Sequence, residues 1–309
     1  MTADGLAPSP SSSAPRPLTP AGAWLMAIRP KTLTAAFVPV GVGTGLAFGM
    51  GVGRWLPALA ALGGALLIQI GTNLTNDYYD FKKGADTAER LGPTRVTQSG
   101  LIAPGKVLAG ALGCFALAIL SGIYLVTVGG WPIVAIGLSS VLFGYAYTGG
   151  PFPLAYHGLG DVFVFVFFGL VAVAGTYYVQ ALTVSPAAGW AAVPVGALGT
   201  ALLVVNNLRD VQTDAKAGKR TLVVRLGPKG GKAEYVLMLV AAYATPFLMF
   251  AGGLASVWVF LALLSAPFAV GPTRLVFGAQ GSALNSALGA TARLQLVFGL
   301  LFAVGLCLR

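Results

Sequence analysis

The chain has 309 residues, of which 56% are hydrophobic and only 9% are charged. Soluble domains are about 25% charged, so this composition excludes a soluble globular protein and indicates a chain embedded in a lipid bilayer. The formal net charge of +10 would suit a nucleic-acid partner. The basic residues, however, fall in short loops between apolar segments, which is typical of membrane orientation, so we expect no nucleic acid.

The first segment of the chain, residues 1–22, is rich in Ala, Pro and Ser. It lacks the charged stretch and apolar run of a signal peptide. We therefore predict a disordered cytoplasmic tail over 1–22, followed by a single transmembrane domain over 23–309.

The transmembrane domain contains nine apolar segments, and a helix needs about 20 apolar residues to cross a bilayer. In chain order they are 33–52, 56–75, 107–128, 132–148, 161–182, 188–206, 235–252, 254–271 and 289–308. The sequence thus predicts an all-α, polytopic membrane bundle with nine transmembrane helices.

The charges orient this bundle. With the N-terminus in the cytoplasm, 17 of the 19 Lys and Arg residues fall on the inner side, and only Arg54 and Arg309 fall outside. Cytoplasmic loops carry such an excess of basic residues. We therefore predict a multi-pass protein of the cytoplasmic (inner) membrane, with its acidic motifs also on the cytoplasmic side.

Two matching runs of Asn and Asp close the second and sixth predicted spans. Their members are Asn76, Asp80 and Asp86 in the first run, and Asn206, Asp210 and Asp214 in the second. Residues four apart share one face of a helix, so within each run these side chains should point together. Asp86 is the exception, since it comes six residues after Asp80, beyond Gly84. The repetition predicts a bundle with two pseudo-repeated halves.

The two runs carry the chemistry of a metal and phosphate site. Carboxylate and amide oxygens are hard ligands that suit Mg²⁺, which usually keeps positions for water and substrate phosphate. We predict that all six side chains hold Mg²⁺ and a diphosphate between the two halves, with Asp80, Asp210 and Asp214 acting in catalysis. Asp77 is either a further ligand or a structural partner.

Several longer runs point to a known family. They are Arg29-Pro30-Lys31-Thr32-Leu33, the run Asn76 to Thr87, Gly92-Pro93-Thr94-Arg95, Tyr147-Thr148-Gly149-Gly150-Pro151, and the run Asn206 to Gly227. With these runs the chain resembles, over about residues 24–309, the UbiA superfamily of intramembrane prenyltransferases, above all its 1,4-dihydroxy-2-naphthoate branch. The displaced Asp86 fits that branch.

The resemblance implies a reaction. A polyprenyl group passes from a polyprenyl diphosphate to 1,4-dihydroxy-2-naphthoate at the carboxylated carbon, and carbon dioxide leaves to give demethylmenaquinol. Other aromatic acceptors, such as homogentisate or hydroxybenzoate, and a phytyl donor remain alternatives. Two rivals of other classes are a membrane transporter, whose sites typically lie near the bilayer midplane, and a membrane scaffold.

Further residues are assigned to the site. Arg95 and Lys219 are predicted to be catalytic, because each lies in one of the specific runs, and the substrate-binding residues are predicted to be Asn76, Asn206, Lys82, Arg220, Arg29, Tyr147, His157 and Asp161. Basic residues would contact phosphate or an acceptor carboxylate, although each also fits simple membrane orientation. Tyr147 offers an aromatic face to a developing cation, or belongs to an interfacial belt. His157 and Asp161 would form a pair that steers an acceptor hydroxyl, or His157 has a structural role, which is the favoured alternative.

An aromatic stripe lies on the fifth predicted span. It consists of Phe163, Phe165, Phe167 and Phe168. We interpret the stripe as core packing or a lipid-facing surface, with a prenyl channel as the alternative.

Overall fold

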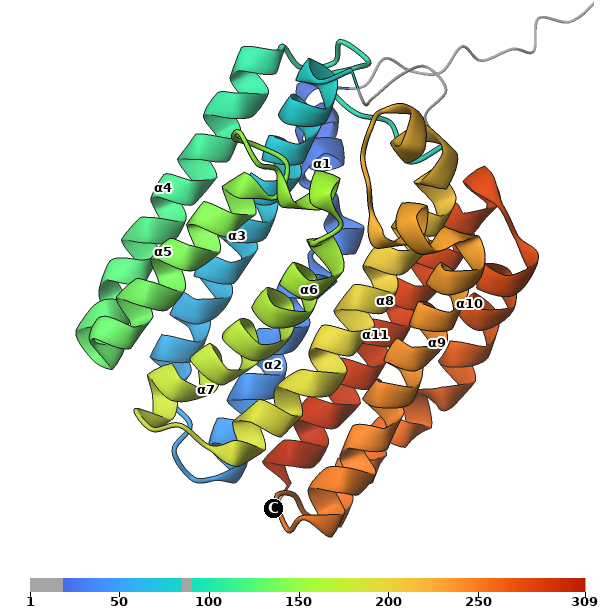
Figure 1. Cartoon of the computed structure of the whole chain (residues 1–309). Coiled ribbons are helices and arrows are strands. Elements are labelled where there is room, and N and C mark those ends of the chain that lie inside the picture. The colour runs from blue at the N-terminus through green and yellow to red at the C-terminus, as the bar shows by residue number, and fades with distance from the viewer. Residues whose placement is uncertain (1–18, 85–90, 309) are drawn as a thin grey trace, which may run out of the picture.

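The computed structural model describes residues 19–84 and 91–308, and all regular secondary structure in these two ranges is helical. Figure 1 shows the helices side by side in one bundle. They are α1 (Pro20–Ile28), α2 (Thr34–Gly49), α3 (Trp55–Lys82), α4 (Pro104–Gly129), α5 (Trp131–Ala146), α6 (Gly160–Val164), α7 (Ala172–Ala181), α8 (Pro186–Lys216), α9 (Leu222–Ala251), α10 (Ala266–Gly278) and α11 (Leu284–Cys307). A π-helical segment, Phe165–Val171, joins α6 to α7, and a 3₁₀ segment, Val257–Ser265, leads into α10.

Each of the nine predicted spans falls on a helix, which confirms the all-α, polytopic prediction. Seven helical segments in the described ranges are long and apolar enough to cross a membrane, and an eighth results if α1 and α2, bent by 49°, cross together. The apolar helix α5 has only 16 residues. The count of nine is therefore not confirmed by length and composition, and it stays a prediction.

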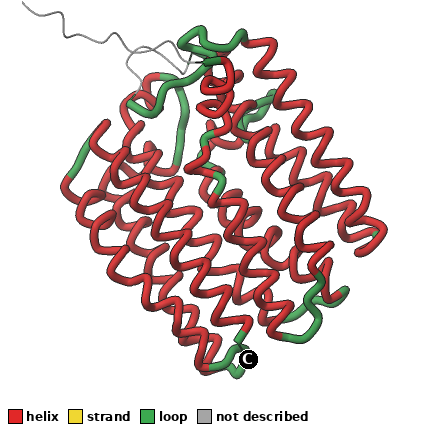
Figure 2. Tube along the Cα trace, turned by 180° about the vertical axis from the view of Figure 1, so that it is seen from behind, coloured by secondary structure: helices red, strands yellow, loops and turns green. Residues whose placement is uncertain are grey.

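The two Asn/Asp runs lie at the same end of the bundle. In Figure 1 the chain leaves α3, α5 and α8 at the end where α1 lies, whereas the C-terminus lies at the opposite end. Figure 2, from behind, shows longer loops gathered at the former end. Because α3 and α8 end at one face of the bundle, the site forms there rather than at mid-depth.

Helix α8 forms the centre of the bundle. It packs against α2, α9 and α11, and its buried side chains are mostly Ala, Gly and Val. Small residues let helix backbones approach closely, which is the usual basis of packing between membrane helices. A rigid central helix holds its polar C-terminal end, with Asn206, Asp210 and Asp214, in a defined position against α3.

The contact between α2 and α11 depends on a glycine. A Cβ added at Gly45 would lie 2.3 Å from the carbonyl oxygen of Ala303, an atom that cannot rotate away. We expect Gly45→Ala to lower the free energy of unfolding by about 1–3 kcal/mol, because overpacking forces the backbone to shift. At Gly41, also on α2, an added Cβ meets nothing within 4 Å. Gly41→Ala should therefore leave the thermal midpoint in detergent unchanged or raised, and equal losses in both variants would contradict this account.

Candidate active site

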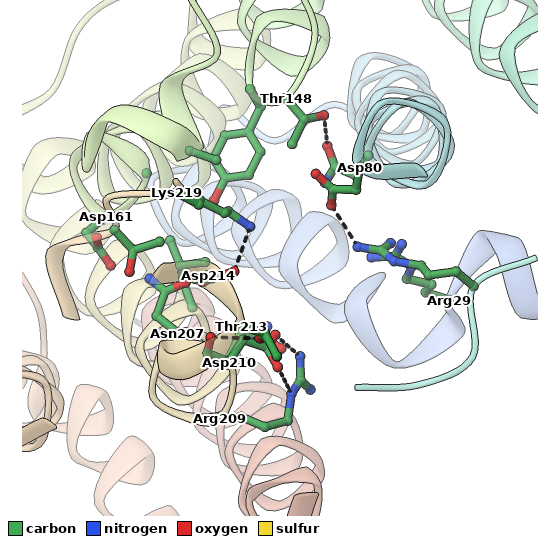
Figure 3. Close-up of a pocket in the computed structure, with 18 residues that line it drawn as sticks. Arg29, Asp80, Thr148, Asp161, Asn207, Arg209, Asp210, Thr213, Asp214 and Lys219 are labelled. Carbon is green, nitrogen blue, oxygen red and sulfur yellow. Dashed lines mark hydrogen bonds and ion pairs between the residues drawn. The ribbon is translucent and has the colours of Figure 1, made fainter. Parts of the chain in front are cut away.

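A polar cavity lies between the C-terminal ends of α3 and α8 (Figure 3). It is lined by both runs, through Asn76, Asp80, Asn206, Asp210 and Asp214. Helix α3 continues to Lys82 and α8 continues to Lys216, so the four-residue steps carry the side chains of each run to the same side of their helix. The sixth predicted ligand, Asp86, lies outside the described residues.

The first run is tied to two loops. One oxygen of the Asp80 carboxylate accepts a hydrogen bond from Arg95 at 3.1 Å, and the other accepts one from the Tyr156 hydroxyl at 3.0 Å. The side-chain oxygen of Asn76 accepts a hydrogen bond from the Thr148 hydroxyl at 2.6 Å. The loops after α3 and α5 therefore close over the end of α3 and bring a guanidinium beside the carboxylate.

Asp77 has a structural role. It is almost fully buried, and its two oxygens accept hydrogen bonds from the backbone N–H groups of Thr97 (3.0 Å) and Val96 (3.3 Å). The guanidinium of Arg29 lies 3.9 Å away. Asp77 does not line the cavity; its carboxylate instead holds the backbone that follows Arg95.

The second run is held by a buried arginine. Arg209 donates two hydrogen bonds to the Asp210 carboxylate, at 2.8 and 2.6 Å, and a third to the side-chain oxygen of Asn285, at 2.8 Å. Asn285 in turn donates to the backbone carbonyl of Leu91 at 2.8 Å. This chain of contacts joins α8, α11 and the loop after α3. Further along the run, Lys219 lies 3.6 Å from the Asp214 carboxylate.

The cavity also gathers most of the other predicted residues. Five of them line it: Arg29, Arg95, Tyr147, Asp161 and Lys219.

Three predicted substrate-binding residues lie elsewhere. Lys82 is exposed at the end of α3, with its ammonium 5.9 Å from the centre of the Tyr78 ring. Arg220 and His157 line a second, more open pocket. The predicted pair of His157 and Asp161 is not formed, because the two residues line different pockets. The His157 ring instead stacks on Phe152, with 3.7 Å between ring centres.

Some lining residues were not singled out from the sequence. They are Thr148, Asn207, Arg209 and Thr213 in the cavity, and Tyr156 as a partner of Asp80. Four of these belong to the runs that indicated the family, so position within those runs was a usable signal. Tyr156 lies outside them, and only the folding of its loop brings its hydroxyl to Asp80.

The donor atoms fit a metal that binds together with a phosphate group. Within residues 19–84 and 91–308, no three His, Cys, Asp or Glu side chains form a metal-binding cluster. The cavity offers Asp80 on one helix, Asp210 and Asp214 on the other, and the amides of both runs. Mg²⁺ typically binds through one or two carboxylates and completes its shell with water and substrate phosphate, so a dispersed set of this kind suits it.

An apolar cavity adjoins the polar one, and Tyr147 lines both. Its walls include Phe163, Phe167 and Phe168, which fits the alternative interpretation of the aromatic stripe as a prenyl channel. Phe163 and Phe167 also pack against Phe143, and Phe165 packs against the core, so the packing interpretation is not contradicted. A further apolar cavity of about 460 Å³ lies toward α4. The two apolar cavities share five lining residues, namely Ala65, Ile68, Ser140, Phe167 and Ala172. A nonpolar path thus leads from the polar site into the bundle.

A helical membrane bundle with this arrangement belongs to the class of intramembrane prenyltransferases. The model of the UbiA prenyltransferase family matches residues 36–306, and the chain belongs to this family. It is 40% identical over 280 residues to a 1,4-dihydroxy-2-naphthoate octaprenyltransferase of Mycobacterium tuberculosis, covering 90% of this chain and 94% of that protein. It is 39% identical to the protein with the same name in Escherichia coli, covering 93% of this chain and 95% of that protein.

A solved structure shares the fold. A UbiA homologue from Archaeoglobus fulgidus, with GPP and Mg²⁺ bound, superposes with a TM-score of 0.60 at 15% sequence identity, covering 90% of this chain and 98% of that one. This confirms the expected bundle architecture.

Proposed function

We propose that this chain is a Mg²⁺-dependent enzyme that transfers a polyprenyl group from its diphosphate to 1,4-dihydroxy-2-naphthoate. The carboxyl group leaves as carbon dioxide, and the product is demethylmenaquinol. The observation that carries this proposal is the junction at Tyr147, where a charged cavity lies next to an apolar one. A prenyl diphosphate has the same division, with a charged head joined to a hydrocarbon chain. The names of the relatives supply the acceptor.

The polar cavity would hold the diphosphate. Asn76 and Asp80 on α3, with Asn206, Asp210 and Asp214 on α8, would hold Mg²⁺, which neutralises negative charge on the departing diphosphate. Arg95 and Lys219 line the same cavity and would contact phosphate oxygens directly. A preorganised cluster of this kind stabilises charge that develops as the allylic C–O bond breaks.

The acceptor would enter at the junction. Arg29 lines the cavity and carries a guanidinium suited to a carboxylate, while Tyr147 offers its ring beside the allylic carbon. A transporter is the less favoured class, because transporter sites usually lie near the bilayer midplane. This site lies at one end of the bundle, where the charged diphosphate and the acceptor carboxylate can reach it from water. We also propose that the site faces the cytoplasm and that the host is the inner membrane, with residues 23–309 as one domain after a tail. The predicted tail over 1–22 is too long at its end, because α1 already begins at Pro20.

A direct assay tests the proposal. Purified protein in nanodiscs is supplied with Mg²⁺, with octaprenyl or phytyl diphosphate and, in turn, with 1,4-dihydroxy-2-naphthoate, homogentisate and hydroxybenzoate, and products are identified by mass. We expect pyrophosphate release and a decarboxylated product with the naphthoate only, and no reaction in EDTA. Turnover with another acceptor would overturn the naphthoate assignment, and a preference for the phytyl donor would overturn the polyprenyl assignment. No turnover with any acceptor would overturn the proposal that the protein is an enzyme.

The apolar path predicts a chain-length effect. Ala65 lines both apolar cavities, so the side chain of Ala65→Trp would block the path between them. We expect kcat/KM to fall at least about tenfold for an octaprenyl donor and much less for geranyl diphosphate, because only the long chain must pass the block. Ala116→Trp, at an exposed position on α4, is the matched control and should affect neither donor. If Ala65→Trp reduced kcat/KM equally for both donors, the prenyl chain would have to lie outside this apolar path.

A further inference from the structure

One carboxylate of the polar cavity differs from the others. Asp80, Asp210 and Asp214 are each paired with a cation, namely Arg95, Arg209 and Lys219 in that order. Asp161 lines the same cavity and is only 5% exposed, yet the structure gives it no ion pair in the described ranges. Its Oδ1 atom is buried without a hydrogen-bond partner. Figure 3 accordingly shows Asp161 with no dashed contact.

An unpartnered buried carboxylate oxygen destabilises the fold, because it has lost its hydrogen bonds to water without gaining a partner in the protein. Groups of this kind are uncommon in native proteins and call for an explanation. The metal and phosphate residues of the site are already balanced by basic side chains, whereas Asp161 is available to accept a hydrogen bond from a bound molecule.

Asp161 lies close to the residue that the polar and apolar cavities share. It is the second residue of α6, and the preceding Gly160 brings the start of that helix against Tyr147. A Cβ added at Gly160 would lie 3.0 Å from the Tyr147 hydroxyl oxygen. Because Tyr147 lines both cavities, Asp161 lies beside the junction at which the allylic carbon would pass from the polar head to the apolar chain.

We infer that Asp161 is the general base that removes the proton from the acceptor hydroxyl next to the carboxylated carbon. This inference rests on the proposed function. As the O–H bond breaks, its electron pair forms a carbonyl, and a ring electron pair forms the new bond to the allylic carbon. The allylic C–O bond breaks with both electrons on the diphosphate.

The same residue completes the reaction. The ring carbon then carries the prenyl group and the carboxylate beside a ketone, so loss of carbon dioxide returns an electron pair to the ring. The ketone oxygen takes back the proton from Asp161, which restores the hydroxyl and the free carboxylate. Proton transfer by a placed side chain typically contributes about 10²–10⁴-fold to a rate.

The test compares Asp161→Asn with the unchanged protein on two acceptors: the naphthoate and a ring-fluorinated analogue with more acidic hydroxyls. We expect kcat for the naphthoate to fall about 100-fold or more, with the KM of the prenyl diphosphate changed less than about threefold. With the fluorinated acceptor the deficit should shrink at least about tenfold, because an acidic hydroxyl needs less help from a base. Asp161→Glu should recover part of the rate.

A second variant keeps the test valid if Asp161→Asn does not fold. Asp161→Ala leaves space for a small carboxylate, and added formate should restore activity in proportion to its concentration. Equal deficits of Asp161→Asn on both acceptors, or no restoration by formate, would overturn the role of Asp161. If the unchanged protein does not prenylate the naphthoate, the proposed function itself fails, so the two failures are distinguishable.

Discussion

Asp80→Asn and Asp210→Asn should each reduce kcat/KM for prenyl transfer about 1,000-fold. Each substitution keeps the shape of the side chain but removes one negative charge from the cavity between α3 and α8. Charge placed against a departing group acts strongly in a site shielded from water, where single contacts are worth about 10²–10³-fold. The rate is measured as pyrophosphate release across a Mg²⁺ titration.

The Mg²⁺ titration shows whether the loss of rate comes from weaker binding of the metal. If these carboxylates hold the metal, the Mg²⁺ concentration for half-maximal rate should rise in both variants. Their thermal midpoints should also fall, because each substitution removes the charge paired with Arg95 or Arg209. Asp77→Asn provides a contrast, because Asp77 holds backbone N–H groups and does not line the cavity. Asp77→Asn should lower the thermal midpoint and leave the Mg²⁺ concentration for half-maximal rate close to that of the unchanged protein. Full activity of Asp210→Asn would remove the second run from the site.

Arg209→Ala should lower the free energy of unfolding by about 3–5 kcal/mol, the usual cost of removing one partner of a buried ion pair. Arg209 is only 4% exposed and donates to both oxygens of Asp210 and to Asn285. Lysine carries the charge but lacks the planar fork, so Arg209→Lys should recover only part of the loss.

Two measurements check the Arg209 prediction. Thermal unfolding in detergent reports the stability, and Arg274→Ala, at an exposed position on α10, should leave the midpoint unchanged. Added Mg²⁺ with pyrophosphate should raise the midpoint of Arg209→Ala more than that of the unchanged protein, because the freed Asp210 carboxylate gains a cation. A midpoint equal to that of Arg274→Ala would show that the contact adds no stability.

Part of the site was predictable because it depends on helix periodicity. The steps from Asn76 to Asp80, and from Asn206 through Asp210 to Asp214, are four residues each, and all five side chains line one cavity. Local geometry suffices for such a prediction, since a helix fixes which side chains share a face. His157 shows the limit. Its spacing from Asp161 is also four, but His157 lies in a separate short 3₁₀ segment, Leu154–His157, so the helical rule does not apply.

The aromatic stripe of the fifth span shows a second limit. Helical periodicity alone does not distinguish Phe165, which packs in the core, from Phe167, which lines the apolar cavity. The segment Phe165–Val171 is π-helical, and this wider turn changes which side chains face inward. The partners of Asp77 and Arg209 across the fold were equally invisible, because they come from the loop after α3 and from α11.

The sequence by itself determined the membrane-embedded helical bundle, the family and the two Asn/Asp runs, because composition, apolar length and four-residue spacing are local properties. The tertiary structure alone decided which charges are balanced and which are not. Asp77 became a structural partner, Arg209 a link between helices, and Asp161 a carboxylate of the polar cavity with no cation among the described residues. These outcomes depend on contacts between residues far apart in the chain, and such contacts are set only when α3, α8 and their loops pack together.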